Sequence, residues 1–181
     1  MRERPPSAEA VPVLPTGNQN DRLPLAPIES SPHGLLTLRC RSVTEGRFRH
    51  LNYVRDLPPY AVDEPSGLPG TDTAPSPSEA LLAALGSSLA MGIHANAVAR
   101  DIVVQRLTLD LEGDTHPTGV ASTSGGGPHA IGFDAIRVTV HFEASAPHDL
   151  LSALVAHATL ASAVANTLHN PVHLDVALAG A

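Results

Sequence analysis

The chain has 181 residues, a net charge of −7, and a hydrophobic content of 43% with only 3% aromatic residues. This length indicates one domain with a core built mainly from Ala, Leu and Val. The negative charge argues against nucleic acid or an anionic membrane as a partner. A single cysteine excludes an intramolecular disulfide bond and a metal cluster held by cysteines. No signal-peptide pattern opens the chain, and we therefore expect a cytoplasmic protein.

The N-terminal segment differs in composition from the rest of the chain. Residues 1–34 are rich in proline and polar residues and show no hydrophobic period. They predict an extended or disordered arm in front of an ordered domain over residues 35–181. The functional alternative for this segment is an arm that wraps a partner subunit.

Alternation of apolar and polar residues predicts three strands after the arm. These strands span residues 35–43, 47–54 and 60–64. In the first strand Leu36, Leu38 and Cys40 would form a half-buried face. We interpret Cys40 there as a small buried hydrophobic residue rather than a reactive thiol.

A loop of turn-forming residues, 65–79, leads into a long predicted helix. Ser76 or Ser78 can cap the helix N-terminus, with Glu79 in the first turn. The following residues, 80–99, contain no charged side chain but include serines, a histidine and an asparagine. Because of these polar residues and the flanking amphipathic strands, we expect a buried core helix at a subunit interface rather than a membrane span.

In the second half of the chain, the hydrophobic pattern again predicts strands and a long helix. The predicted elements are strands over 102–114 and 136–144, a helix over 147–168 and a strand over 171–179, with a flexible glycine-rich excursion over 113–133. One face of the last strand would consist of Val172, Leu174, Val176 and Leu178. Three strands, a helix, two strands, a helix and a strand together predict an α+β fold.

Four stretches of the sequence are specific when taken together: DEPSGLPGTDTAPSPSEALLAALGSSLAMGI (63–93), LDLEGD (109–114), GFDAIRVTV (132–140) and SAVANTLHNPVHLDVAL (162–178). They resemble the OsmC/Ohr family of bacterial hydroperoxide reductases. The resemblance extends over residues 35–178. It implies an OsmC-like fold in which curved, mostly antiparallel sheets surround two long buried helices, within an intertwined homodimer.

The resemblance also implies a chemistry that this chain lacks the residues to perform. The family uses two redox cysteines, and the matching positions hold Ser88 and Ser162, with Ala163 in place of a usual proline. Attack on an O–O bond needs a thiolate, which becomes a sulfenic acid, and a serine hydroxyl does not react in this way. Cys40 matches neither position. A hydroperoxide reductase is an alternative only if Ser88 replaces a native cysteine.

By resemblance, an arginine and an acidic group would accompany Ser88 at the dimer interface. Arg47 is the best match for the arginine, with Arg49 second, and Asp72 is the nearest acidic candidate. The alternative for Arg47 is a solvated charge at a strand end. The alternative for Ser88 is a hydroxyl that bonds back to the Ala84 carbonyl and fills space.

A nucleophilic Ser88 would need a base within reach. His94 lies six residues further along the helix, which places it about 9 Å away and over 200° round the axis. A dyad with His94 within one chain is therefore disfavoured, although His94 stays a candidate for the pocket. The candidates for a histidine supplied by a partner subunit are His50, His129 and His157.

No metal or cofactor site is expected. His169 and His173 are four residues apart, but Pro171 between them prevents a helical ligand pair.

Two hypotheses for the function remain. In the first, the dimer-interface pocket carries out non-redox chemistry on a small apolar metabolite, with secondary metabolism as a plausible setting. In the second, the same pocket binds a small ligand or lipid without turnover.

Overall fold

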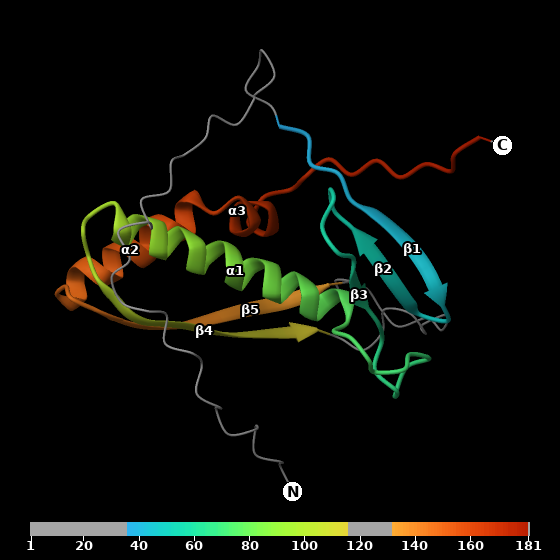
Figure 1. The fold of residues 1–181 in the computed structure, drawn as a ribbon, viewed down its shortest axis with the longest axis horizontal. Coiled ribbons are helices and arrows are strands. Elements are labelled where there is room, and N and C mark those ends of the chain that lie inside the picture. The colour runs from blue at the N-terminus through green and yellow to red at the C-terminus, as the bar shows by residue number, and fades with distance from the viewer. Residues whose placement is uncertain (1–35, 116–131, 181) are drawn as a thin grey trace, which may run out of the picture. The chain divides into compact units, whose positions relative to one another are not determined.

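The computed structural model describes residues 36–115 and 132–180 and has an α+β architecture (Figure 1). Its elements are β1 (Arg41–Gly46), β2 (Arg49–Tyr53), β3 (Tyr60–Val62), α1 (Pro77–Val98), β4 (Val104–Thr115), β5 (Phe133–Ala144), α2 (His148–Ala161) and α3 (Ala163–His169). The arm predicted over 1–34 and most of the glycine-rich excursion lie outside the described residues. The described residues divide into two compact units, one formed by 86–111 with 136–180 and the other by 36–85 with 112–115 and 132–135.

The three N-terminal strands form an antiparallel sheet in the order β1-β2-β3. Val43 of β1 pairs with Leu51 of β2, and a bulge follows between Thr44 and Gly46. The turn after it places Arg47 in the left-handed region, with φ of 48°. The second and third predicted strands are confirmed.

The first strand begins later than its alternation predicted. Residues 36–40 form no strand, and the side chains of Leu36 and Leu38 are 55% and 84% exposed. Cys40 is also exposed, so its interpretation as a buried residue is wrong for the single chain. A strand needs a hydrogen-bonded neighbour, and this flank has none within the described part of the chain.

Helix α1 begins with a reciprocal cap that selects Ser76 over Ser78. The Ser76 hydroxyl accepts a hydrogen bond from the backbone N–H of Glu79 at 3.3 Å, and the Glu79 carboxylate accepts from the backbone N–H of Ser76 at 2.7 Å. This pairing satisfies two backbone donors that a helix start leaves free. The helix ends before Asp101, whose φ of 55° reverses the chain, and the Ile102 N–H returns to the Ala97 carbonyl at 3.0 Å.

The core of the first unit lies between α1 and α2. Ile93 on α1 and Leu154 on α2 are 1% and 2% exposed. Gly92 lets the helices approach closely, because a Cβ atom there would lie 3.2 Å from the Cβ of Ala158. Substituting this glycine would push the helices apart, since packed interiors leave little room for an extra methyl group.

One face of α1 is buried and the other is not. Met91 is 66% exposed, and 28% of the most apolar window of the helix is buried. The single chain therefore buries only one side of the helix, and the expected subunit interface on the other side stays a prediction. By length and composition α1 could cross a membrane, and α2 with α3 would be a second candidate only if the bent pair formed one span.

The last third of the chain corrects two predictions. The single helix over 147–168 is two helices, α2 and α3, bent by 65° where Ser162 has extended backbone angles. The strand over 171–179 is absent, and these residues form neither helix nor strand. Its four apolar side chains are highly exposed: Val172 62%, Leu174 81%, Val176 84% and Leu178 99%. No neighbouring strand holds this segment within the described residues.

Candidate functional site

Two serine hydroxyls from distant parts of the sequence meet inside the first unit. Oγ of Ser88, in the middle of α1, lies 2.8 Å from Oγ of Ser162, between α2 and α3. Ser162 is 5% exposed, and Ser88 is half-buried. The expected back-bond from Ser88 to the Ala84 carbonyl does not form, because the hydroxyl bonds to Ser162 instead.

The break between the helices holds Ser162 in place. Ser162 caps the N-terminus of α3, and its Oγ accepts a hydrogen bond from the Ala165 N–H at 3.1 Å. A serine is well suited to this position, because its hydroxyl satisfies a free backbone donor at a helix start. The hydroxyl therefore has two fixed neighbours, the Ala165 amide and Ser88.

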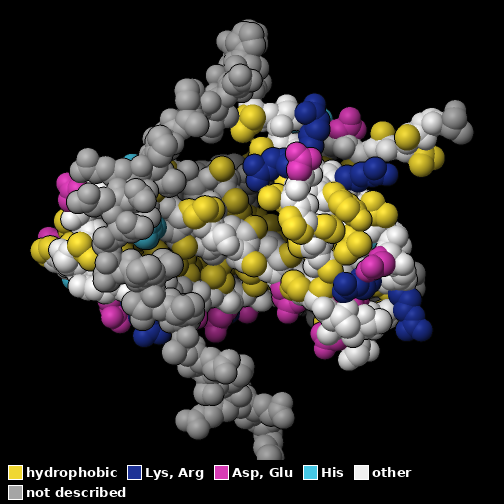
Figure 2. Space-filling view, viewed as in Figure 1, with side chains coloured by type: hydrophobic (Ala, Val, Ile, Leu, Met, Phe, Trp, Pro, Cys, Tyr) yellow, Lys and Arg dark blue, Asp and Glu magenta, His cyan; other side chains and the backbone are white. Residues whose placement is uncertain are grey.

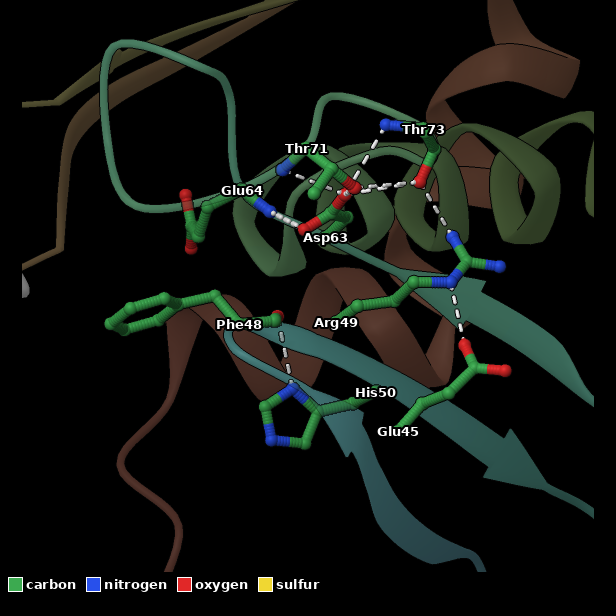
Figure 3. Close-up of polar contacts among 8 residues, drawn as sticks. All are labelled: Glu45, Phe48, Arg49, His50, Asp63, Glu64, Thr71 and Thr73. Atoms are coloured by element: carbon green, nitrogen blue, oxygen red, sulfur yellow. Dashed lines mark hydrogen bonds and ion pairs between the residues drawn. The ribbon is translucent and has the colours of Figure 1, made fainter.

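No base contacts the serine pair within the described part of the chain. His94 is half-buried on α1, and its side chain makes no hydrogen bond to another described residue. His157 is exposed on α2, and Nδ1 of His50 lies 3.1 Å from the Phe48 carbonyl (Figure 3). His129 lies outside the described residues. Among the described residues of the single chain, the pair is thus a hydroxyl–hydroxyl contact without a histidine partner.

The second unit contains a polar network centred on Asp63, which the sequence reasoning did not select. Asp63 is 1% exposed and follows directly after β3. Its carboxylate accepts hydrogen bonds from the backbone N–H groups of Glu64, Thr71 and Thr73 and from both threonine hydroxyls, at 2.5 to 3.2 Å (Figure 3). These contacts fold the loop before α1 back onto the strand end.

The network lowers the pKa of Asp63 well below its usual range, chiefly through the Thr71 hydroxyl, while burial acts in the opposite direction. A lowered pKa means that the folded state prefers the charged carboxylate more than the unfolded state does. The resulting stabilisation is fully present above the ordinary carboxyl pKa. It is lost as the pH falls below that value towards the lowered one.

Arg49, rather than Arg47, is held by this network. Its Nε donates to the Glu45 carboxylate at 2.6 Å, and its Nη1 donates to Oγ1 of Thr73 at 2.8 Å (Figure 3). Arg47 is exposed in the turn between β1 and β2. The geometry therefore favours Arg49 as the organised guanidinium of the N-terminal sheet.

Asp72, the acidic candidate from the sequence, is exposed in the loop with φ of 55°. Its backbone N–H bonds to the Glu64 carbonyl at 3.1 Å, but its side chain has no partner among the described residues.

The sequence contained a weak signal for Asp63: an aspartate at a strand end, with two threonines eight and ten residues later. The spacing of these residues in the sequence cannot show that the loop folds back and brings both threonines to the Asp63 carboxylate. The described residues contain no cluster of three metal-ligating side chains.

The arrangement defines a class of protein, an α+β chain with a long central helix. A hydroxyl in the middle of that helix contacts the residue that caps α3, at the break between α2 and α3. The chain belongs to the OsmC-like protein family, whose model matches residues 70–177. The expected family and OsmC-like fold are thus confirmed. A search of the curated proteins finds no significant match.

Solved structures show the same fold at low sequence identity. An OsmC-like protein of Mycoplasma pneumoniae is 14% identical, with a TM-score of 0.63 over 74% of this chain and 88% of its own. An organic hydroperoxide resistance protein OsmC of Legionella pneumophila is 20% identical, with a TM-score of 0.53 over 74% and 90%. A Vibrio cholerae protein with captopril bound in one of its active sites is 14% identical, with a TM-score of 0.52 over 74% and 86%.

Proposed function

We propose that this OsmC-like protein binds a small, largely apolar molecule at the Ser88–Ser162 pair and performs no thiol redox chemistry. The observation that carries the proposal is the 2.8 Å contact between the two hydroxyls. By resemblance, these are the positions of the two redox cysteines. Peroxide reduction needs a thiolate that becomes a sulfenic acid, and neither hydroxyl can replace it.

The hydrogen bonds of the pair favour binding over catalysis. Two hydroxyls carry two protons, and their mutual contact uses one of them. Ser162 accepts from the Ala165 amide, which uses a lone pair and no hydroxyl proton. One O–H therefore remains to donate to a ligand. Nucleophilic attack would also require a base, and none contacts Ser88 within the described residues.

Exposed apolar surface supports a homodimer as the setting of this site. Met91 on α1 and Leu160 on α2 are 66% and 78% exposed, and hydrophobic side chains spread over the face shown in Figure 2. Soluble monomers seldom expose large contiguous apolar surface. We propose that a second copy covers these helices and completes the ligand pocket. The captopril held by the Vibrio cholerae protein is consistent with a small-molecule pocket in this fold.

Two unpaired segments of the chain suit such a dimer. Residues 36–40 and 171–179 both alternate apolar and polar side chains, and both lack a strand partner among the described residues. Their charges are complementary, with Arg39 in the first and Asp175 in the second. We propose that the C-terminal segment of one copy pairs beside residues 36–40 of the other, because paired strands satisfy the backbone groups of both.

Cys40 gives a direct test of this pairing. Leu174→Cys and Val176→Cys place a thiol on the face that we expect to share with Cys40. Mild oxidation should then give a covalent dimer on a non-reducing gel, because opposite residues in paired strands have Cβ atoms about 5 Å apart. Asp175→Cys is the matched control, since its side chain lies on the other face. A disulfide within one chain, or equal cross-linking by all three variants, would contradict the exchange.

Cumene hydroperoxide, a small aromatic molecule with one polar end, is the probe for the ligand site. In a Cys40→Ser background, which removes the exposed thiol, we expect saturable binding by calorimetry and full recovery of the hydroperoxide. Ser88→Ala should weaken binding about three- to tenfold, because one hydrogen bond contributes about 0.5–1.5 kcal/mol. Ser87→Ala, at the exposed neighbouring position, should leave the affinity unchanged.

Three outcomes would count against the binding proposal. Absence of binding, or equal binding by the Ser88→Ala variant, would remove the serine pair from the site. Covalent labelling of Ser88 by a fluorophosphonate would show an activated serine. That last result would favour non-redox catalysis, with a base supplied by the second copy.

A further inference from the structure

The break between α2 and α3 is unexpected from the residues that form it. α2 ends at Ala161, α3 begins at Ala163, and the helices are bent by 65°. Alanine has the highest helix propensity, and serine is tolerated in helix interiors. No proline or glycine interrupts residues 161–163, so a contact elsewhere must stabilise the break.

Asn166 provides this contact. Its side-chain Nδ2 donates to the carbonyls of Leu160 and Ser162, each at 2.8 Å, and its backbone N–H also donates to the Ser162 carbonyl at 3.0 Å. In an unbroken helix the Leu160 carbonyl would accept from the N–H of Val164. The Asn166 amide thus replaces a backbone donor that the break removes, and it bonds to both sides of the junction.

The break determines where the Ser162 hydroxyl lies. Ser162 has φ of −71° and ψ of 117°, which are extended values, and it caps α3 through the Ala165 N–H. In a continuous helix that N–H would bond to the backbone carbonyl of Ala161, and Ser162 would no longer act as a cap. The contact with Ser88 therefore depends on the broken conformation.

We propose that Asn166 is the positioning residue of the Ser88–Ser162 site, because it stabilises the helix break that holds the Ser162 hydroxyl against Ser88. This inference rests on the proposed function to the extent that the serine pair is the ligand site. The role is geometric, since the Asn166 side chain bonds to the Leu160 and Ser162 carbonyls and acts on Ser88 through Ser162.

A disulfide across the pair measures this geometry without a ligand. In a Cys40→Ser background, Ser88→Cys with Ser162→Cys is equilibrated with reduced and oxidised glutathione. The two thiols lose two electrons and two protons to form the disulfide, and one oxidised glutathione becomes two reduced molecules. Adding Asn166→Ala should lower the equilibrium constant for the disulfide at least about tenfold. Asn170→Ala should leave it unchanged, because its side-chain amide donates to the backbone carbonyl of Asn166, which Asn166→Ala retains, and to neither side of the break.

A rescue variant separates positioning from general loss of structure. Ala163 is the first residue of α3, where proline is favoured, and a following proline holds Ser162 in extended conformations. Ala163→Pro should therefore restore the disulfide constant in the Asn166→Ala variant. Circular dichroism then checks that every variant keeps its helix content.

An unchanged disulfide constant in Asn166→Ala would overturn the inference. So would failure of Ala163→Pro to restore it, because the loss would then not arise from the break. The outcome is distinguishable from failure of the proposed function. If cumene hydroperoxide does not bind but the disulfide depends on Asn166, the function fails and the positioning role stands.

Discussion

Replacing Ser88 and Ser162 together by cysteine is expected to give the protein a hydroperoxide-consuming activity, supported by a dithiol reductant, that we propose the native chain lacks. The two hydroxyl oxygens already lie 2.8 Å apart, which is close enough for thiols at the same positions to form a disulfide after small adjustments. A thiolate at position 88 can attack the O–O bond, and the second thiol can resolve the sulfenic acid. We expect cumene hydroperoxide consumption at least ~100-fold above the native rate.

The controls identify which thiol acts. Each protein is measured both with Cys40 and with Cys40→Ser, because Cys40 is exposed and could react with peroxide itself. Ser87→Cys with Ser162→Cys places the first thiol one residue away on α1, about 100° round the helix axis, where it faces away from position 162. This control should consume the hydroperoxide much more slowly than the variant with cysteine at positions 88 and 162. Activity of the native chain that vanishes with Cys40→Ser would refute the loss of peroxidase chemistry. An inactive double variant would indicate a pocket reshaped beyond the two side chains.

Substituting Gly70 by alanine is expected to lower the free energy of unfolding by about 2–4 kcal/mol. A Cβ atom at Gly70 would overlap the carbonyl oxygen and the carbonyl carbon of Glu64. Both are backbone atoms, so no side-chain rotation can relieve the overlap. The Glu64 backbone cannot shift freely either, since its N–H is bonded to the buried Asp63 carboxylate at 2.8 Å.

Gly67 provides the matched control for this prediction. It lies in the same loop, and a Cβ atom there would meet nothing within 4 Å. Gly67→Ala should change the free energy of unfolding, measured by urea titration, by less than about 0.5 kcal/mol. Equal effects of the two substitutions would show that the loop is not held in the conformation that Asp63 imposes. A large effect of Gly70→Ala alone would confirm the close backbone approach.

Local signals in the sequence predicted the central helix and its start correctly. Ser76, Glu79 and the uncharged run after them are neighbours in the chain, and capping and helical hydrogen bonds join residues three or four positions apart. The hairpin-like strands β1 to β3 were also recognisable, because each pairs with the next strand in sequence. The resemblance to the family further singled out Ser88 and Ser162 as a pair.

Other features of the fold and site depend on partners that sequence spacing does not reveal. The alternation at 36–40 and 171–179 predicted strands, but a strand forms only beside another strand, and the described chain offers neither segment a neighbour. Asp63 was overlooked because its donors lie across a loop. Arg49 was ranked below Arg47, although the turn exposes Arg47 and the loop engages Arg49.

By itself, the sequence determined the family, the α+β class, the position of α1, and the absence of cysteine from the two positions that the resemblance marks as redox-active. These depend on residue identity and on contacts within a few residues. Only the tertiary structure decided that Ser162 lies at a helix break and bonds to Ser88, and that Asp63 folds the loop before α1. Hydrogen bonds between residues distant in the chain determine these features, and their geometry exists only once the chain has folded.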